Sequence, residues 1–240
     1  MVEEMARPLL CNLDASNMNL NDKKILIVSS HPDDEAICSG GLIMKGKKEN
    51  ADMFVLYIST GRSRQFTNGE TLEQDRINEA IDASDYGNFG YKIAFKGTST
   101  RLDIMPQKNI IEEIENMVKL FEPEMVVIPN KNSYAQDHRA VAEACISAFR
   151  PIPSNLHHQP KMILEIEEAT RWPVASNPNF YVDISDVFED KIELYKCHKT
   201  QLVEDPHPRS FENLRRLAGL RGTEIGVKYA EAYTLLRGQL

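Results

Sequence analysis

The chain has 240 residues, of which 42% are hydrophobic and 27% are charged, a composition typical of a globular protein with one sizeable core. Acidic side chains outnumber lysine and arginine by 36 to 28, and the formal net charge of -8 disfavours broad binding to nucleic acid or to anionic membranes. The four cysteines are scattered without a Cys-x-x-Cys pair, which argues against a cysteine zinc site and against a disulfide framework.

Residues 1–22 are interpreted as an N-terminal extension, followed by one domain over residues 23–240. The extension lacks the basic start and the long apolar run of a signal peptide, and no apolar run approaches the ~20 residues that a membrane-spanning helix needs. We therefore expect a cytoplasmic protein with reduced thiols and no membrane span. Apolar residues in the extension are compatible with a homo-oligomer without requiring one.

Short apolar runs alternate with longer amphipathic segments along most of the chain. The runs predict strands at residues 24–29, 53–59, 92–95, 125–129, 162–166 and 180–184. Helical spacing of apolar side chains predicts helices at residues 36–47, 72–84, 108–121 and 136–149. Strands that alternate with helices form parallel βαβ units, so the expected fold is α/β: a Rossmann-like, doubly wound, mainly parallel sheet with helices on both faces.

The C-terminal part of the chain follows a proline-rich stretch, residues 149–161, that is interpreted as a loop. Beyond the last predicted strand, residues 191–202 and 210–238 both have helical patterns. We expect this helical tail to cap the sheet or to form one wall of a pocket.

Three polar loops directly follow predicted strands: SSHPDDE at residues 29–35, STGRSR at 59–64 and PNKNSYAQDHR at 129–139. In a doubly wound sheet, ligands bind in the crevice at the carboxyl ends of the strands, so these loops are expected to converge on one crevice. The first loop carries an imidazole and three carboxylates in sequence. Like charges so close together need a compensating group, for which a metal cation is the obvious candidate.

His31 and Asp34 lie close together in a turn, and His138 opens the helix that follows the fourth strand. Two imidazoles and one carboxylate make an open metal site with room for water and substrate, which suits Zn²⁺ and is compatible with Fe²⁺. A bound cation lowers the pKa of its water, and Asp33 is then free to act as general base. Glu35 is interpreted as a cap of the helix N-terminus.

An acidic helix start offers a simpler explanation of this stretch, because aspartate and glutamate are favoured in the first turn of a helix. For any single aspartate that explanation is the better one. The combination of His31, Asp33 and Asp34 with the distant Gln-Asp-His sequence favours the metal site. Asp137, beside His138, is interpreted as a carboxylate that orients the histidine ligand, with a plain N-cap as its alternative.

These motifs resemble those of a known family. SSHPDDE is similar to the AHPDDE signature of the PIG-L/LmbE family of zinc-dependent de-N-acetylases, and QDHRAVAEA at residues 136–144 resembles its second motif, in which a histidine precedes a helix. Weaker likenesses are RINEA at 76–80, RLD at 101–103 and YAEAY at 229–233. The resemblance implies a Rossmann-like hydrolase that removes an N-acetyl group from an amino sugar such as N-acetylglucosamine, free or linked to a nucleotide or lipid.

Carried over to this chain, the family's roles make Asp33 the general base and assign the zinc ion to His31, Asp34 and His138. The sequence departs from the family at Ala135, where many members carry a histidine that stabilises the oxyanion or protonates the leaving amine. His207, in the loop DPHPRS, is the candidate catalytic replacement, with an ordinary exposed loop as the equal alternative. Arg209, in the same loop, is a candidate for binding substrate.

Further substrate contacts are sought among polar residues near the ligand side of the sheet. The candidates are Arg62, Arg64, Arg76 and Asp103, because guanidinium and carboxylate groups bind sugar hydroxyls and guanidinium also binds phosphate. For each of them, an ion pair or a solvated surface position is at least as good an explanation. His198 is expected on a helix surface and is not counted as a ligand.

Two other functions are compatible with the same residues. A catalytically inactive member of the fold would bind sugar without turnover, although an inactive site has no need of its base. A non-haem iron enzyme would use His31, Asp33 and His138 as a facial triad, which usually sits on β-rich barrels. The chain has no Gly-x-Ser-x-Gly elbow and no Gly-x-Gly-x-x-Gly fingerprint, so a serine hydrolase and a nicotinamide-binding enzyme are not favoured.

Overall fold

A seven-stranded sheet forms the middle layer of the protein in the computed structural model, which describes residues 19–61, 72–97, 101–153, 157–170, 172 and 176–239. Its strands are β1 Lys24–Ser29, β2 Asp52–Ser59, β3 Gly90–Phe95, β4 Met125–Ile128, β5 Met162–Ile166, β6 Phe180–Asp183 and β7 Ala230–Gly238. They lie in the order β3-β2-β1-β4-β5-β7-β6. Strands β1 to β5 pair in parallel, and β7 runs antiparallel to both β5 and β6.

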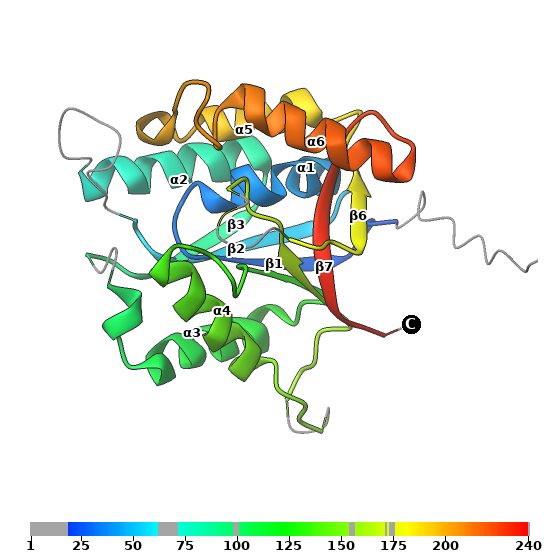
Figure 1. The fold of residues 1–240 in the computed structure, drawn as a ribbon. Coiled ribbons are helices and arrows are strands. Elements are labelled where there is room, and N and C mark those ends of the chain that lie inside the picture. The colour runs from blue at the N-terminus through cyan, green and yellow to red at the C-terminus, as the bar shows by residue number, and fades with distance from the viewer. Residues whose placement is uncertain are drawn as a thin grey trace, which may run out of the picture.

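Helices cover both faces of the sheet, which makes the molecule a three-layer α/β/α sandwich (Figure 1). One layer consists of α1 Asp34–Lys48, α2 Glu73–Gly87, α5 Phe188–Lys196 and α6 Phe211–Ile225. The other consists of α3 Gln107–Phe121 and α4 Gln136–Ala148. Two short 3-10 turns are η2 Leu102–Ile104 and η3 Lys199–Gln201. Across the described ranges, none of the helices has the length and apolarity that a membrane crossing needs.

Alternation along the central strand divides the core between the two faces. Ile25 and Ile27 of β1 belong to the apolar cluster beneath α1, α2 and α5, whereas Leu26 and Val28 belong to the cluster beneath α3 and α4. All four side chains are at most 2% exposed. Burial on both faces explains why this strand is a continuous apolar run rather than an alternating one. Both helical layers therefore pack on β1, which fixes the position of the polar turn at its carboxyl end.

The predicted doubly wound α/β fold is confirmed, and all six predicted strands form. The expectation of a helix throughout residues 210–238 is wrong. α6 ends at Gly226, whose φ of 75° is the left-handed conformation that glycine adopts readily. The chain then reverses into β7, where Tyr233 and Thr234 favour a strand and pair with β5.

The strand order reverses at β1 and β4, which are neighbours in the sheet. From β1 the chain continues to β2 and β3 on one side, and then crosses back to β4 on the other side. The loop after β1 passes to α1 on one face, and the loop after β4 passes to α4 on the opposite face (Figure 1). The two loops therefore diverge and leave a crevice at the place where doubly wound sheets bind their ligands.

Candidate active site

The turn between β1 and α1 places three polar side chains at this crevice. Asp33 is the N-cap residue of α1 and has a φ of 132°, a backbone conformation that costs an L residue about 1–3 kcal/mol. Asp34 begins the helix, and its Oδ2 accepts a hydrogen bond of 3.0 Å from the backbone N–H of His31. Gly61, which follows β2, approaches the same turn. Its φ is 68° and a Cβ there would lie 2.7 Å from the Cβ of His31, so glycine is required.

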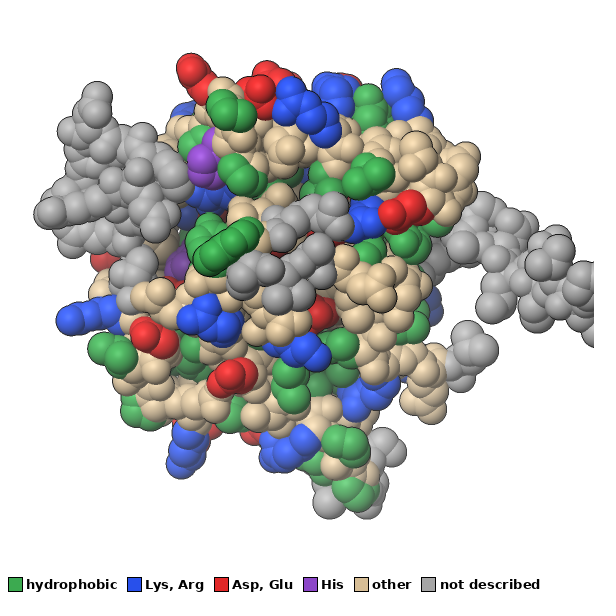
Figure 2. Space-filling model, viewed as in Figure 1, with side chains coloured by type: hydrophobic (Ala, Val, Ile, Leu, Met, Phe, Trp, Pro, Cys, Tyr) green, Lys and Arg blue, Asp and Glu red, His purple; other side chains and the backbone are tan. Residues whose placement is uncertain are grey.

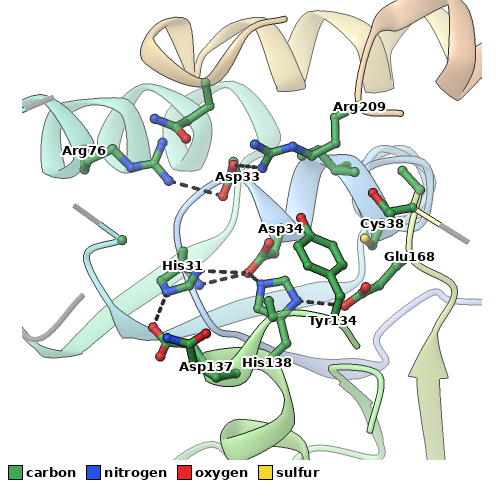
Figure 3. Close-up of a pocket in the computed structure, with 17 residues that line it drawn as sticks. His31, Asp33, Asp34, Cys38, Arg76, Tyr134, Asp137, His138, Glu168 and Arg209 are labelled. Carbon is green, nitrogen blue, oxygen red and sulfur yellow. Dashed lines mark hydrogen bonds and ion pairs between the residues drawn. The ribbon is translucent and has the colours of Figure 1, made fainter. Parts of the chain in front are cut away.

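Among the described residues, one group of metal-ligating side chains is found: His31, Asp34 and His138 (Figure 3). Their ligand atoms all lie within 4.8 Å of one another. His138 Nε2 is 3.3 Å from Asp34 Oδ2, and His31 Nδ1 is 3.8 Å from the same oxygen. The fold thus brings together two motifs that are far apart in the sequence. Asp34 rather than Asp33 completes the group, which argues against the facial triad considered for a non-haem iron enzyme.

Each histidine of this cluster is oriented by a second carboxylate. His31 Nε2 lies 2.9 Å from Asp137 Oδ2, and His138 Nδ1 lies 2.8 Å from Glu168 Oε1. A carboxylate accepts hydrogen bonds, so these ring nitrogens are the donors, and an imidazole with a single proton holds it there. The lone pairs of His31 Nδ1 and His138 Nε2 are then left facing Asp34. Two nitrogens and one carboxylate converge in the tautomers that a cation such as Zn²⁺ requires, so the residues present fit a metal ion.

Asp33 lies beside the cluster and is held by two arginines. Its Oδ1 is 3.2 Å from Arg76 Nη2, its Oδ2 is 3.0 Å from Arg209 Nη1, and the residue is 3% exposed. Burial alone would raise the pKa of this carboxyl group. The surrounding positive groups, Arg76 and Arg209 foremost, together outweigh burial and hold the pKa of Asp33 below its usual value. Asp33 is therefore an ionised, buried carboxylate that does not share the ligand position of its neighbour.

His138 lies between two carboxylates, Asp34 and Glu168. Burial opposes a charge on its ring, but the two carboxylates outweigh burial and raise the pKa of His138 to about 9. Burial also raises the pKa of Asp34, against the opposing attraction of His138. In the metal-free protein, a proton on His138 thus supplies the positive charge that a cation would bring.

We expect the metal affinity to rise with pH up to about 9, because a cation must displace the proton from His138. One displaced proton changes the apparent dissociation constant about tenfold per pH unit. For the same reason, the metal-free protein loses stability as the pH rises from about 6.5 to about 9, since the unfolded chain releases this proton first. Competition with a chromophoric chelator measures the affinity, and a flat profile over this range would contradict the assignment.

An open cavity of about 450 Å³ surrounds these groups, a volume in the usual range of small-molecule sites. Figure 3 shows Arg76 and Arg209 reaching Asp33 from α2 and from the loop before α6. The remaining wall includes Tyr134, Cys38 and Glu168. On the described part of the face in Figure 2, basic and acidic side chains are interspersed rather than gathered by sign. The volume of the cavity suits a small molecule.

The structure brings seven of the predicted site residues to the lining of this cavity: His31, Asp33, Asp34, Arg76, Asp137, His138 and Arg209. Asp103 and His207 lie outside the lining. The side chain of Asp103 is exposed in η2. The contact of this turn with the site comes from the preceding residue, because the backbone N–H of Leu102 donates to Asp137 over 3.0 Å. His207 Nδ1 accepts the backbone N–H of Arg209 over 3.1 Å, so its ring orders the loop that presents this arginine.

Other expectations fall outside the described residues or differ from what is observed. Arg62 and Arg64 lie outside the described part of the chain. Glu35 is more than a helix cap, and His198 is not on a surface, because both are at most 1% exposed and His198 Nε2 lies 2.6 Å from Glu35 Oε1. Glu168 was not identified from the sequence. Its place at the carboxyl end of β5, the strand beside β4, was a signal that it shares with Glu165 and Glu167.

A protein-family model described as GlcNAc-PI de-N-acetylase (PIG-L) matches residues 26–149. The chain is 27% identical to a diacetylchitobiose deacetylase from Thermococcus kodakarensis, over 98% of this chain and 92% of that protein. An N,N'-diacetylchitobiose deacetylase structure from Pyrococcus horikoshii has a TM-score of 0.72 at 20% identity, covering 94% of this chain and 90% of the other. A 4-carboxy-2-hydroxymuconate hydratase structure from Pseudomonas putida has a TM-score of 0.73 at 20% identity, covering 91% and 98%. A fold that supports both reactions does not by itself assign one.

Proposed function

Because the chain belongs to the PIG-L (GlcNAc-PI de-N-acetylase) family, whose model matches more than half of it, we propose that it hydrolyses the N-acetyl group of an amino sugar with the help of a bound cation. The curated relative named above is a deacetylase of diacetylchitobiose, and the chain aligns with nearly all of that protein. The observation that carries the proposal is the cluster of His31, Asp34 and His138 with an ionised Asp33 beside it. Neither a hydratase nor a passive sugar-binding protein is favoured by a comparable observation.

Zn²⁺ is the proposed cation, held by His31, Asp34 and His138, and Fe²⁺ is the other cation that this ligand set accepts. When bound, it would polarise the amide carbonyl and lower the pKa of a water molecule toward neutrality. Asp137 and Glu168 would keep the two imidazoles in the ligating tautomer throughout. The protein thus supplies a pre-oriented set of ligands rather than flexible side chains.

Asp33 is proposed as the general base, which takes a proton from the attacking water. The same carboxyl group then returns that proton to the nitrogen as the C–N bond breaks, so that acetate and the free amine leave. Arg76, which is 1% exposed, fixes the direction of the carboxylate. The side chain of Arg209 is 17% exposed and lines the cavity, so its donors can be shared between Asp33 and the substrate.

Arg209, rather than His207, is proposed to stabilise the negative charge that develops on the carbonyl oxygen. Ala135, where many family members carry a histidine, lines the cavity and offers no donor from its side chain. His207 lies outside the lining, whereas the guanidinium of Arg209 is inside it and is always charged. A fixed cationic donor at this place is the kind of group that stabilises an oxyanion.

Acetate release from N-acetylated amino sugars tests the proposed function. We expect the metal-loaded protein to release acetate from N-acetylglucosamine or diacetylchitobiose, a chelator to stop the reaction, and added zinc to restore it. Binding of these sugars without acetate release by the fully loaded protein would contradict the proposal and support the inactive, sugar-binding alternative.

A further inference from the structure

The unusual backbone conformation of Asp33 is held by a buried carboxylate. The residue has a φ of 132° and caps α1 without any side-chain capping bond. Its backbone N–H instead donates to Glu35 Oε2 over 2.9 Å. Glu35 is 1% exposed, so solvent cannot stabilise its charge, and a buried carboxylate needs a partner of its own.

That partner is His198, which follows α5 and is 0% exposed. His198 Nε2 lies 2.6 Å from Glu35 Oε1. Burial opposes a charge on this imidazole, but the carboxylate outweighs burial and raises the pKa of His198. The other ring nitrogen, Nδ1, is buried with no hydrogen-bond partner in the part of the chain that the structure describes. An apolar side chain would fill the same space but would leave the buried Glu35 Oε1 without this partner, so the contact with Glu35 explains a histidine here better than packing does.

A second line of contacts reaches Asp33 from the same segment. Thr200 donates its backbone N–H to Glu79 Oε1 over 2.6 Å and its hydroxyl to Glu79 Oε2 over 3.0 Å. Glu79 Oε2 is in turn 3.2 Å from Arg76 Nη1, and Arg76 Nη2 is 3.2 Å from Asp33 Oδ1. His198 therefore acts on the backbone of Asp33, and Thr200 acts on its carboxylate.

We propose that residues 198–201, here called the support segment, are a positioning element for the general base, which they fix through Glu35 on one side and through Arg76 on the other. This inference rests on the proposed role of Asp33. The two side chains that anchor the segment lie outside the cavity lining. They act through Asp33 and do not touch the substrate.

Loosening either contact line should affect the chemical step more than substrate binding. Proton transfer from the attacking water depends on a short and directed approach, and a displacement of about 1 Å costs roughly 100-fold in rate. The three cluster residues keep their own contacts. Gln201 of the support segment does line the cavity, and its amide donates to Thr200 Oγ1 over 3.0 Å, whereas His198→Leu leaves this bond in place. We therefore expect kcat to fall while KM and the metal content stay close to those of the wild type.

The test compares His198→Leu, which removes the donor to Glu35, with His198→Gln, which keeps an N–H donor. His198→Leu is expected to lower kcat by about 10- to 100-fold with KM within about twofold, and His198→Gln to recover most of that loss. Thr200→Val removes the hydroxyl that bonds Glu79 and Gln201 but keeps the backbone N–H bond to Glu79. It should give a smaller fall in kcat, which keeps the test decisive if His198→Leu does not fold. His158→Leu is the matched control, because His158 bonds only the backbone oxygen of Pro123 in the described contacts, and kcat should not change.

Hydrogen exchange at the backbone N–H of Asp33 gives a readout that does not depend on activity. We expect His198→Leu to speed this exchange by about tenfold or more, because the bond to Glu35 loses its support. Faster exchange supports the positioning even if the wild type releases no acetate, a result that would overturn the proposed function alone. Unchanged kcat and exchange in the folded variants would overturn the inference, as would a loss of kcat that His198→Gln does not reduce.

Discussion

The Asp33→Asn variant is expected to keep its metal and to lose about 10²- to 10⁴-fold in kcat, because an amide cannot take the proton of the attacking water. The substitution preserves the volume of the side chain, so the cavity keeps its shape. Metal binding should survive, since Asp33 is not part of the cluster formed by His31, Asp34 and His138. The rate of acetate release at saturating substrate, recorded with the metal content of the same sample, checks this prediction.

Asp103→Asn is the matched control, because it makes the same chemical change at an exposed position outside the cavity. Its kcat should equal that of the wild type. Asp33→Asn also removes the partner of two guanidinium groups, and breaking a buried ion pair costs about 3–5 kcal/mol. Arg76 keeps Glu79 as a partner, so we expect Asp33→Asn to lower the free energy of unfolding by an amount near the lower end of this range. Thermal unfolding of each variant shows whether the fold persists. A folded Asp33→Asn variant with kcat within about tenfold of the wild type would contradict the role of base.

The proximity of His31, Asp34 and His138 could be predicted because these residues lie in or just after loops that follow strands. His31 comes two residues after β1, and His138 lies in the first turn after the β4 loop. Once βα alternation fixes a parallel sheet, the carboxyl ends of its strands share one edge, and the topology alone brings neighbouring loops together. The order of strands and helices in the sequence is therefore enough to predict which loops lie close together, even when no side-chain contact is known.

The carboxylate that orients His138 could not be selected in the same way. Three glutamates, at positions 165, 167 and 168, end β5 and begin the loop that follows it. In the structure, Glu165 accepts the backbone N–H of Lys131, Glu167 pairs with Arg221, and Glu168 reaches His138. Each has a different partner from a distant segment, so only tertiary packing distinguishes the three. The pairing of Glu35 with His198, 163 residues away, is hidden for the same reason.

The strand at the C-terminus shows a different limit. Residues 226–238 contain good helix formers, and a local pattern of apolar residues is compatible with a helix or a strand. One edge of β5 pairs with β4, and β7 pairs with the other edge. β7 therefore lies between β5 and β6 in the sheet. Glu231 of this strand accepts the backbone N–H of Gly41 over 2.7 Å and pairs with Lys191. Long-range pairing thus decides an element that local propensity leaves open.

Removing a ligand of the cluster should remove the metal and the activity together. Asp34→Ala and His138→Ala are each expected to lower the metal content from about one equivalent to below about 0.1, and kcat by more than about 10³-fold, since two remaining ligands do not hold a catalytic ion. Elemental analysis of the purified variants, beside acetate release, measures both effects. His158→Ala, which makes the same change at a histidine bonded to a backbone oxygen, should keep full metal content.

Glu168→Gln provides an intermediate case that separates ligation from orientation. The amide can still contact His138 Nδ1 but carries no charge, and loss of such an orienting carboxylate weakens metal affinity by about 10- to 100-fold. A metal present at about 1,000 times its dissociation constant stabilises the folded chain by about 4 kcal/mol. Added zinc should therefore raise the melting temperature of the wild type, and that of Glu168→Gln at a higher zinc concentration. It should not raise the melting temperature of Asp34→Ala or of His138→Ala. Full metal content in either Asp34→Ala or His138→Ala would contradict the assignment. It would mean that the turn after β1 and the start of α4 do not bind one ion together, because a shared site needs a ligand from each of them.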